Sequence, residues 1–140
     1  MMRKIIPDVI RGQEVVHLAG EATAGEAARL MHDRNVGAIL VMKKKRLEGI
    51  LTVADMTYRV VAQGRDPETT PLYEVMTAAP DTVGPDCAAI DALRMMQDGG
   101  YRHLPVVEGG TVLGVVSRRD FHGCEKARLD EETILWERIA

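Results

Sequence analysis

The chain reads Gly49-Ile50-Leu51-Thr52-Val53-Ala54-Asp55 and, 65 residues later, Gly114-Val115-Val116-Ser117-Arg118-Arg119-Asp120. Each copy places a glycine before two branched apolar residues, then a hydroxyl residue, and an aspartate three positions after the hydroxyl. Such a short apolar run is typical of a buried strand, and Thr or Ser is a preferred cap at a helix N-terminus. Both copies therefore predict a strand that ends at the hydroxyl residue and a helix that begins immediately after it.

The similarity between the two halves extends beyond these copies. At the same offset, residues 17–56 align with residues 82–121 without a gap, and eight of the forty pairs are identical. Average residue usage gives about two or three identities by chance. The identical pairs are Ala24/Ala89, Ala27/Ala92, Arg29/Arg94, Met31/Met96, Asp33/Asp98, Val41/Val106, Gly49/Gly114 and Asp55/Asp120. The chain is therefore predicted to be an internal duplication.

Each half is predicted to form a strand, a helix, two further strands and a second helix, which together make a mixed α/β (α+β) fold. In the first half these are strand His17–Leu18, a helix opened by the capping box of Thr23 and Glu26, strand Val36–Met42, the cationic turn Lys43–Arg46, strand Leu47–Thr52 and a helix from Val53 to about Gln63. In the second half they are strand Thr82–Val83, a helix capped by Asp86 that stops at Gly99-Gly100, strand Arg102–Val107, the turn Glu108–Thr111, strand Val112–Ser117 and a helix from Arg118.

Four segments are expected along the chain. Residues 5–64 form the first repeat, and residues 65–81 form a polar linker with a short helix that starts at Thr70-Pro71. Residues 82–125 form the second repeat. Residues 126–140 are predicted to form an amphipathic C-terminal helix, whose apolar stripe consists of Ile134, Leu135 and Ile139, with Trp136 beside it.

Length and composition exclude several classes of protein. The 140 residues amount to one domain, and the longest apolar run, Val36–Met42, is far shorter than the about 20 residues that a membrane span needs. The first residues lack the apolar region of a signal peptide, so we expect a cytoplasmic protein. A net charge of −3 argues against general nucleic-acid binding. Cys87 and Cys124 form neither a disulfide framework nor a zinc site by themselves, and both are expected to be reduced thiols.

The two seven-residue copies, together with Gly100-Tyr101-Arg102-His103-Leu104-Pro105-Val106-Val107, resemble a tandem pair of cystathionine-β-synthase-type (CBS) domains, a Bateman module. Val75-Met76-Thr77, leading into Thr82-Val83, is similar to the usual lead-in of this family. The resemblance covers about residues 5–125. It implies two pseudo-symmetric β-α-β-β-α repeats packed through their sheets, as in stand-alone bacterial CBS proteins.

The resemblance implies a regulatory module that binds an adenosine-containing ligand in a cleft between the repeats, and AMP, ADP, ATP and NAD(H) all remain open as that ligand. A carboxylate can accept both hydroxyls of a ribose, which assigns ribose binding to Asp55 and Asp120 with their caps Thr52 and Ser117. Phosphate binding is assigned to Arg102, His103, Arg118 and Arg119, assisted by free N–H groups at the helix N-termini. The flat apolar slot that adenine needs is assigned to Val36, Gly37, Ala38, Ile39, Tyr101, Leu104 and Pro105.

The two repeats differ in charge at equivalent positions. The first has Val53-Ala54 where the second has Arg118-Arg119, and Gly37-Ala38 where the second has Arg102-His103. We therefore expect the second repeat to favour phosphate-bearing ligands. The first repeat is left with three alternatives: it holds a less charged group, it borrows cations across the cleft, or it stays empty.

Each candidate residue also has a structural interpretation. An aspartate in the first turn of a helix can serve only to stabilise the helix dipole. Arg118-Arg119 can be a solvated pair, and His103 a neutral, hydrogen-bonded residue beside a strand. The turn Lys43–Arg46 is interpreted as a solvated hairpin turn, with partner docking as the lesser alternative.

No catalysis and no bound metal are expected. Ser117, His103 and Asp120 lack the Gly-x-Ser-x-Gly turn of a nucleophile, and His122-Gly123-Cys124 lacks the second ligand pair of a zinc site. Because family members usually pair, a homodimer is expected. The rival hypothesis is a ligand-free scaffold that dimerises or docks a target protein, which the sequence does not identify. Nucleic-acid binding through Lys43–Arg46 and Arg118-Arg119 is a third alternative, disfavoured by the acidic net charge.

Overall fold

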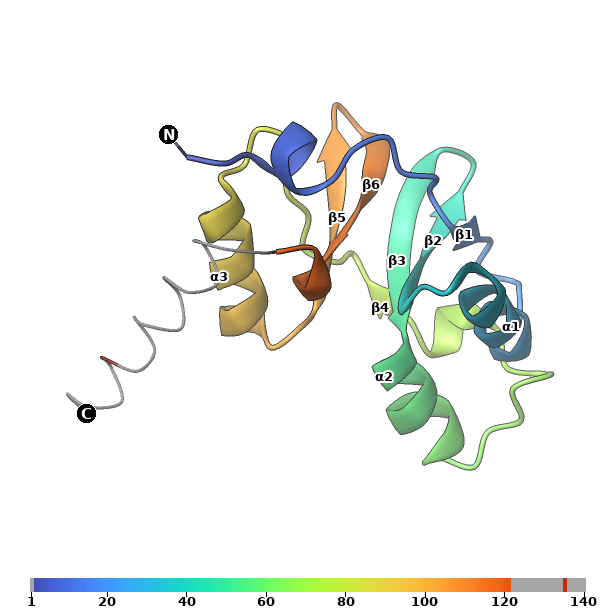
Figure 1. The fold of residues 1–140 in the computed structure, drawn as a ribbon. Helices are drawn as coiled ribbons and strands as arrows, with labels where there is room; N and C mark the ends of the chain where they lie inside the picture. The colour runs from blue at the N-terminus through green and yellow to red at the C-terminus, as the bar shows by residue number, and fades with distance from the viewer. Residues whose placement is uncertain (1, 122–134, 136–140) are drawn as a thin grey trace. The chain divides into compact units, whose positions relative to one another are not determined.

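The computed structural model describes residues 2–121 and Leu135 (Figure 1). Apart from Leu135, the predicted C-terminal helix over residues 126–140 lies outside the described residues, and so do His122 and Cys124. Among the described residues, none of the helices has the length and apolar character that a membrane span requires.

The chain forms two compact units, whose ends differ from those of the sequence repeats. Val15–Pro80 makes up one unit, called here the first-repeat unit. Residues 2–14 join residues 81–121 in the other, the second-repeat unit. The linker predicted between the repeats thus completes the first-repeat unit, and the start of the chain completes the second.

Equivalent hydrogen bonds attach these two completing segments. In the first-repeat unit, the N–H group of Ala24 donates to the carbonyl of Thr70 at 2.8 Å. In the second-repeat unit, the N–H group of Ala89 donates to the carbonyl of Arg3 at 2.8 Å. Because Ala24 and Ala89 are the first residues of equivalent helices, each completing segment covers the start of a helix.

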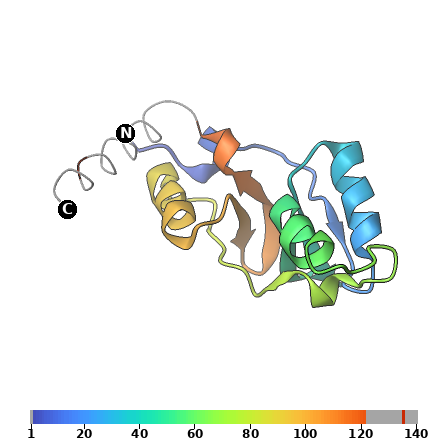
Figure 2. The same ribbon diagram turned by 90° about the horizontal axis from the view of Figure 1, so that it is seen from below.

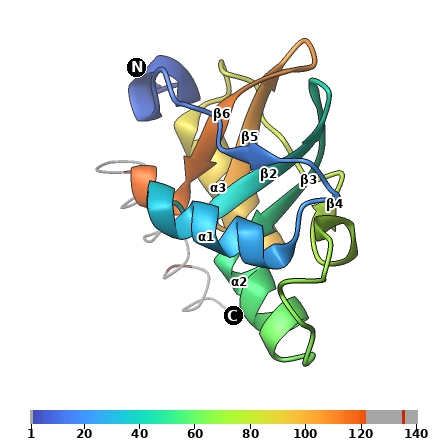
Figure 3. The ribbon, with the colours of Figure 1, turned by 90° about the vertical axis from the view of Figure 1, so that its right-hand side faces the viewer.

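The first-repeat unit is a four-stranded sheet covered by helices. Its elements are β1 (His17–Leu18), α1 (Ala24–Arg34), β2 (Ala38–Lys43), β3 (Arg46–Thr52), α2 (Val53–Asp55), a π-helical continuation over Met56–Val61, a 3₁₀ turn over Leu72–Glu74 and β4 (Thr77–Ala78). The strand order is β1-β2-β3-β4, with β1 parallel to β2 and the other neighbours antiparallel. Both α1 and α2 lie on the same face of the sheet (Figure 3).

The core of this unit follows the alternation of the strands. Ile39 and Val41 of β2 are fully buried against α1 and the π-helical turn, and Leu51 is the register partner of Ile39 on the same face. Ala27 of α1 is also fully buried, which allows the helix to approach the sheet closely. The capping box predicted for Thr23 is confirmed, since its hydroxyl accepts the N–H group of Glu26 at 3.2 Å.

The second-repeat unit repeats this plan with a smaller sheet. Its elements are a π-helical turn over Ile5–Val9, α3 (Ala89–Gly99), β5 (His103–Glu108), β6 (Thr111–Ser117) and a 3₁₀ turn over Arg118–Asp120 (Figure 2). The β5–β6 hairpin shifts register between Val106 and Val107, and the β2–β3 hairpin shifts between Val41 and Met42, which are the equivalent residues. The predicted duplication of a mixed α/β fold is thus confirmed.

Two predictions for the second half are wrong. Asp86 does not cap α3, because the helix begins at Ala89 and the cap position is occupied by Ala88, whose side chain has no acceptor. Asp86 instead faces Lys4, with 3.6 Å between its carboxylate and the ammonium group. The strand predicted at Thr82–Val83 is reduced to one parallel bridge between Val83 and Val106. This bridge matches the pairing of Leu18 with Val41 in β1 and β2.

The helix predicted from Val53 to about Gln63 is also modified. Its first turn is α-helical, but from Met56 the hydrogen bonds span five residues, as in the 2.9 Å bond from Ala62 N–H to the carbonyl of Thr57. Gly64 follows with a φ of +68°, the left-handed conformation expected after a helix end. In the second repeat, the structure describes only the single 3₁₀ turn Arg118–Asp120 at the equivalent place.

Ile5→Ala is expected to weaken the second-repeat unit, because removing a fully buried isoleucine side chain costs about 2–5 kcal/mol. Amide hydrogen exchange followed by mass spectrometry should show faster exchange in α3, β5 and β6 than in β2 and β3. Leu72→Ala is the matched change in the segment that completes the first-repeat unit. It should give faster exchange in β2 and β3 than in α3, β5 and β6. Equal loss of protection in both units from either variant would contradict this assignment of the two segments.

Candidate functional site

The candidate site residues of each repeat meet where the second hairpin strand passes into a helical turn. In the first repeat, the N–H group of Val53 donates to the carbonyl of Gly37 at 3.1 Å. In the second, the N–H group of Arg118 donates to the carbonyl of Arg102 at 2.9 Å. These equivalent bonds bring the segment before each hairpin next to the residue that follows its last strand.

The two aspartates fold back onto their own caps. Oδ2 of Asp55 accepts two hydrogen bonds from Thr52, one from the backbone N–H at 2.9 Å and one from the hydroxyl at 3.1 Å. In return, the backbone N–H of Asp55 donates to the Thr52 hydroxyl at 3.2 Å. The Asp120 carboxylate accepts the N–H of Ser117 at 2.7 Å through Oδ2. The Asp55 side chain is only 14% exposed. Both carboxylates therefore have the structural capping role, and neither extends into open solvent.

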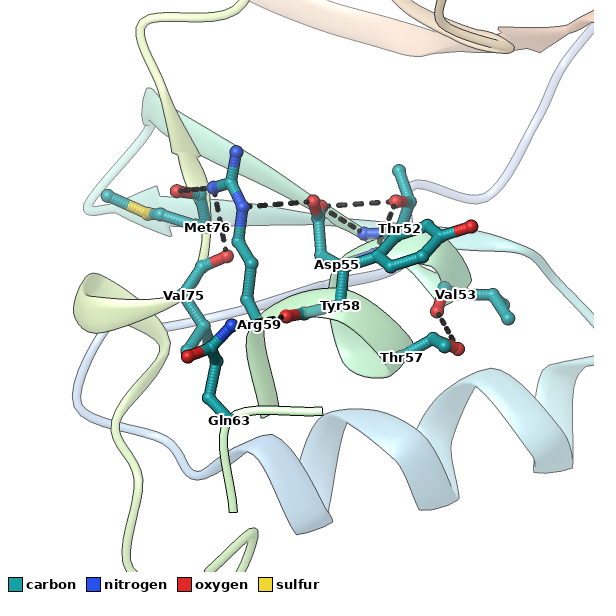
Figure 4. Close-up of polar contacts among 9 residues, drawn as sticks. All are labelled: Thr52, Val53, Asp55, Thr57, Tyr58, Arg59, Gln63, Val75 and Met76. Carbon is teal, nitrogen blue, oxygen red and sulfur yellow. Dashed lines mark hydrogen bonds and ion pairs between the residues drawn. The ribbon is translucent and has the colours of Figure 1, made fainter. Parts of the chain in front are cut away.

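Arg59 is a site residue that the sequence interpretation missed (Figure 4). Its Nε lies 3.6 Å from Oδ1 of Asp55, and its Nη1 donates to the carbonyls of Val75 and Met76 at 3.2 and 2.8 Å. A signal for the ion pair exists in the sequence, because side chains four residues apart share a helix face. The contact with Val75 and Met76 has no such signal, since it joins segments that only the fold brings together.

The second repeat gathers a different set of charges. His103 begins β5 and is the register partner of Ser117 at the end of β6. Burial lowers the pKa of His103 below its ordinary value of 6.5, and the charges of Arg119 and Arg102 lower it further, while Asp120 opposes them. Arg119, Arg102 and Asp120, which the sequence assigned to phosphate and ribose binding, thus all lie near enough to His103 to influence its charge.

The helix N-termini are less open than expected. Capping by Asp55 uses the N–H group of Thr52, and the N–H groups of Val53 and Asp55 also have partners. In the second repeat, Ser117 and Arg118 donate their N–H groups to Asp120 and Arg102. The prediction that free N–H groups await a phosphate at these positions is therefore wrong for those residues, because the capping boxes and the hairpin carbonyls already accept from them.

The residues assigned to the adenine slot divide by orientation. Ile39 and Leu104 are fully buried in the cores of their own units, where their side chains pack against helices. Val36 packs against the first-repeat core in the same way. Gly37, Ala38 and Pro105 belong to neither core cluster, and Gly37 and Pro105 use their carbonyls to accept N–H groups of Val53 and Val83. Ala38 and Pro105 are nonetheless buried and Gly37 is half-buried, so of these three residues only Gly37 has partly exposed surface for the predicted slot.

Tyr101 has a structural position. Its ring packs against the second-repeat core, and its hydroxyl donates to Asp81 at 2.8 Å. Burial, together with this bond to a carboxylate, raises the pKa of Tyr101 to about 12. The ring also occupies the space that a side chain at Gly99 would need. Tyr101 therefore joins the loop after α3 to the segment before it.

The remaining candidates do not form a cluster. Among residues 2–121, no group of three or more His, Cys, Asp or Glu side chains has a geometry that could hold a metal ion. Cys87 is half-buried, and burial raises the pKa of its thiol, which disfavours the reactive thiolate. The basic turn is exposed from Lys43 to Arg46, and its two outer cations belong to β2 and β3.

The lowered pKa of His103 predicts a pH dependence of stability. The unfolded chain takes up this proton near pH 6.5, whereas the folded protein keeps the ring neutral to lower pH. The free energy of unfolding should therefore fall as the pH drops through 6.5, and this loss should level off below the folded-state pKa. Urea denaturation at pH 8 and pH 5.5 should show a larger loss for the wild type than for His103→Gln. Equal losses in the two proteins would show that His103 does not titrate in this way.

The family model described as CBS domain matches residues 8–62 and 72–123. YhcV, a CBS domain-containing protein of Bacillus subtilis, is 37% identical over 107 residues, which cover 76% of each protein. By contrast, the chain spans between 15% and 20% of the length of five Arabidopsis thaliana relatives.

Solved structures share the fold. The CBS domain protein PAE2072 from Pyrobaculum aerophilum, complexed with AMP, aligns with a TM-score of 0.76 and 26% identity, over 89% of this chain and 95% of that one. A hexameric CBS-CP12 protein from bloom-forming cyanobacteria aligns with a TM-score of 0.78 and 29% identity, over 86% of this chain and 66% of that one. With two matched copies, equivalent hairpins and equivalent capping boxes, the chain belongs to the CBS-domain family.

Proposed function

We propose that this chain is a regulatory module that binds an adenosine-containing ligand through the residues around Asp120 and does not catalyse a reaction. AMP, ADP, ATP and NAD(H) are the candidate ligands. In this proposal the ribose hydroxyls donate to Asp120, and the phosphate binds the cations assigned to it, Arg102, Arg118 and Arg119.

The observation that supports it most is the set of charges around Ser117. His103 is the register partner of Ser117, whose N–H donates to Asp120, and the charges of Arg119, Asp120 and Arg102 all act on the His103 ring. A nucleotide carries both a diol that donates to a carboxylate and an anionic phosphate that binds arginine well. The similarity to PAE2072, whose structure contains AMP, supports the same class of ligand.

Such a ligand would act by linkage. A ligand that binds only the folded protein stabilises it by about 1.4 kcal/mol at ten times its dissociation constant. It changes the signalling state of the module only to the extent that it binds one conformation more tightly than another. Signalling to a target therefore requires a second arrangement of the protein with a different affinity for the ligand.

Thermal unfolding with a panel of AMP, ADP, ATP, NAD(H) and S-adenosylmethionine tests the proposal. At ten times its dissociation constant, a bound nucleotide should raise the Tm by about 4–7 °C. Asp120→Asn keeps an acceptor for the Ser117 N–H but removes the charge, so it should abolish the increase. Asp86→Ala removes an exposed carboxylate of the same unit and should leave the increase intact. If no nucleotide raises the Tm of the wild type, the proposal fails.

A second candidate function is a scaffold without a ligand that dimerises or docks another protein. The helical segment after Thr52 favours it, because Val53, Tyr58 and Val61 are 55%, 69% and 71% exposed. Exposed apolar side chains on one short segment are common at protein contacts. The hexameric CBS-CP12 relative is an assembly built on the same fold.

If this segment pairs two copies, Val61→Asp should disrupt the pairing, because it places a charge in an apolar contact. Light scattering coupled to size-exclusion chromatography should then give a dimer mass for the wild type and a monomer mass for the variant. Gln63→Asp adds the same charge at an exposed position two residues further on, and serves as the control. A wild type that is monomeric at micromolar concentration would contradict the homodimer.

A further inference from the structure

Arg59 is held beside Asp55 by contacts that do not involve Asp55. Its Nη1 donates to the carbonyls of Val75 and Met76 at 3.2 and 2.8 Å (Figure 4). The guanidinium group is planar and has its donors at fixed positions, so two such bonds define its orientation. Since these bonds already order the side chain, little further conformational entropy is lost when its Nε faces Asp55.

The acceptor sites left on the Asp55 carboxylate lie beside Arg59. Its Oδ2 already accepts both the N–H and the hydroxyl of Thr52, and its Oδ1 forms an ion pair with Arg59, whose Nε lies 3.6 Å away. An ionised carboxylate offers about four lone-pair positions in total, so the two that a ribose diol would need are both on Oδ1, next to the guanidinium. That guanidinium also compensates the negative charge that makes a carboxylate a strong acceptor. The side chain is also only 14% exposed.

The equivalent carboxylate in the second repeat has a different environment. Asp120 accepts the N–H of Ser117 at 2.7 Å, and no arginine forms an ion pair with it among the residues that the structure describes. The residue 65 positions after Arg59 is Cys124 in the sequence, which carries no positive charge. The duplication therefore conserves the carboxylate but not the cation that faces it.

We infer that Arg59 is a specificity-determining residue that closes Asp55 to ribose, so that each chain binds one adenosine ligand, at the Asp120 repeat. This inference rests on the proposed function and adds a stoichiometry and a cause for it. It also selects among the alternatives for the first repeat: without its arginine, that repeat would bind a nucleoside, and with it the repeat stays empty.

Isothermal titration calorimetry with AMP measures the number of sites per chain. The wild type should bind one AMP per chain, and Arg59→Gln should bind two. In the variant, the first repeat should bind AMP at least tenfold more tightly than the first repeat of the wild type does. Arg65→Gln is the matched control, because it removes an arginine of the same unit that pairs with Glu74 at 2.6 Å. It should keep one site. Arg59→Met provides a second neutral variant, and thermal unfolding shows that each variant is folded.

Combined variants identify which repeat holds each site. Asp120→Asn should abolish AMP binding by the wild type but leave one site in Arg59→Gln. Two sites in the wild type would overturn the inference while leaving the proposed function intact, and so would loss of the wild-type site in Asp55→Asn rather than in Asp120→Asn. One site in folded forms of both Arg59 variants would also overturn it. If no variant binds AMP, the proposed function fails and the inference fails with it.

Discussion

A single interaction governs both repeats: a carboxylate three residues after a strand end folds back to accept the backbone N–H of the residue at that end. In the first repeat this bond joins Asp55 to Thr52, and in the second it joins Asp120 to Ser117. The bond stops the strand and starts a helical turn, because it satisfies an N–H group that neither element can pair.

The same carboxylates are the leading candidates for ligand binding, so structure and function share one group. A substitution that removes the carboxylate changes the local fold and the acceptor together, whereas an amide keeps the fold interaction. The two roles compete for lone pairs, and the neighbours of each carboxylate decide how many remain. Arg59 beside Asp55 in the first repeat, and His103 under the influence of Arg102 and Arg119 in the second, are the features that make the two halves unequal.

Much of this architecture could be predicted from the sequence. The duplication fixed the order of strands and helices, and the apolar runs located both hairpins to within one or two residues. The predictions failed where tertiary contacts override local signals. Asp86 has the residue type of a cap, but α3 begins at the position that the repeat requires, after Ala88. Ile39 and Leu104 have the residue type of an apolar slot, but strand alternation turns their side chains into the core.

The residues that could not be predicted act across long sequence separations. Arg59 reaches the carbonyls of Val75 and Met76, and Tyr101 reaches Asp81. Neither contact leaves a periodic pattern. The division of the chain into units could not be predicted either, because no sequence pattern in residues 2–14 assigns them to the second half rather than the first.

The place of residues 2–14 has a consequence for synthesis of the protein on the ribosome. The chain emerges from its N-terminus, and domains generally fold as units during synthesis. Val15–Pro80 is contiguous, so it can fold as soon as it has emerged. Residues 2–14 must instead wait for partners such as Cys87 and Ala89, which are translated much later. Ile5, fully buried in the finished protein, is therefore exposed in the nascent chain until the second half arrives.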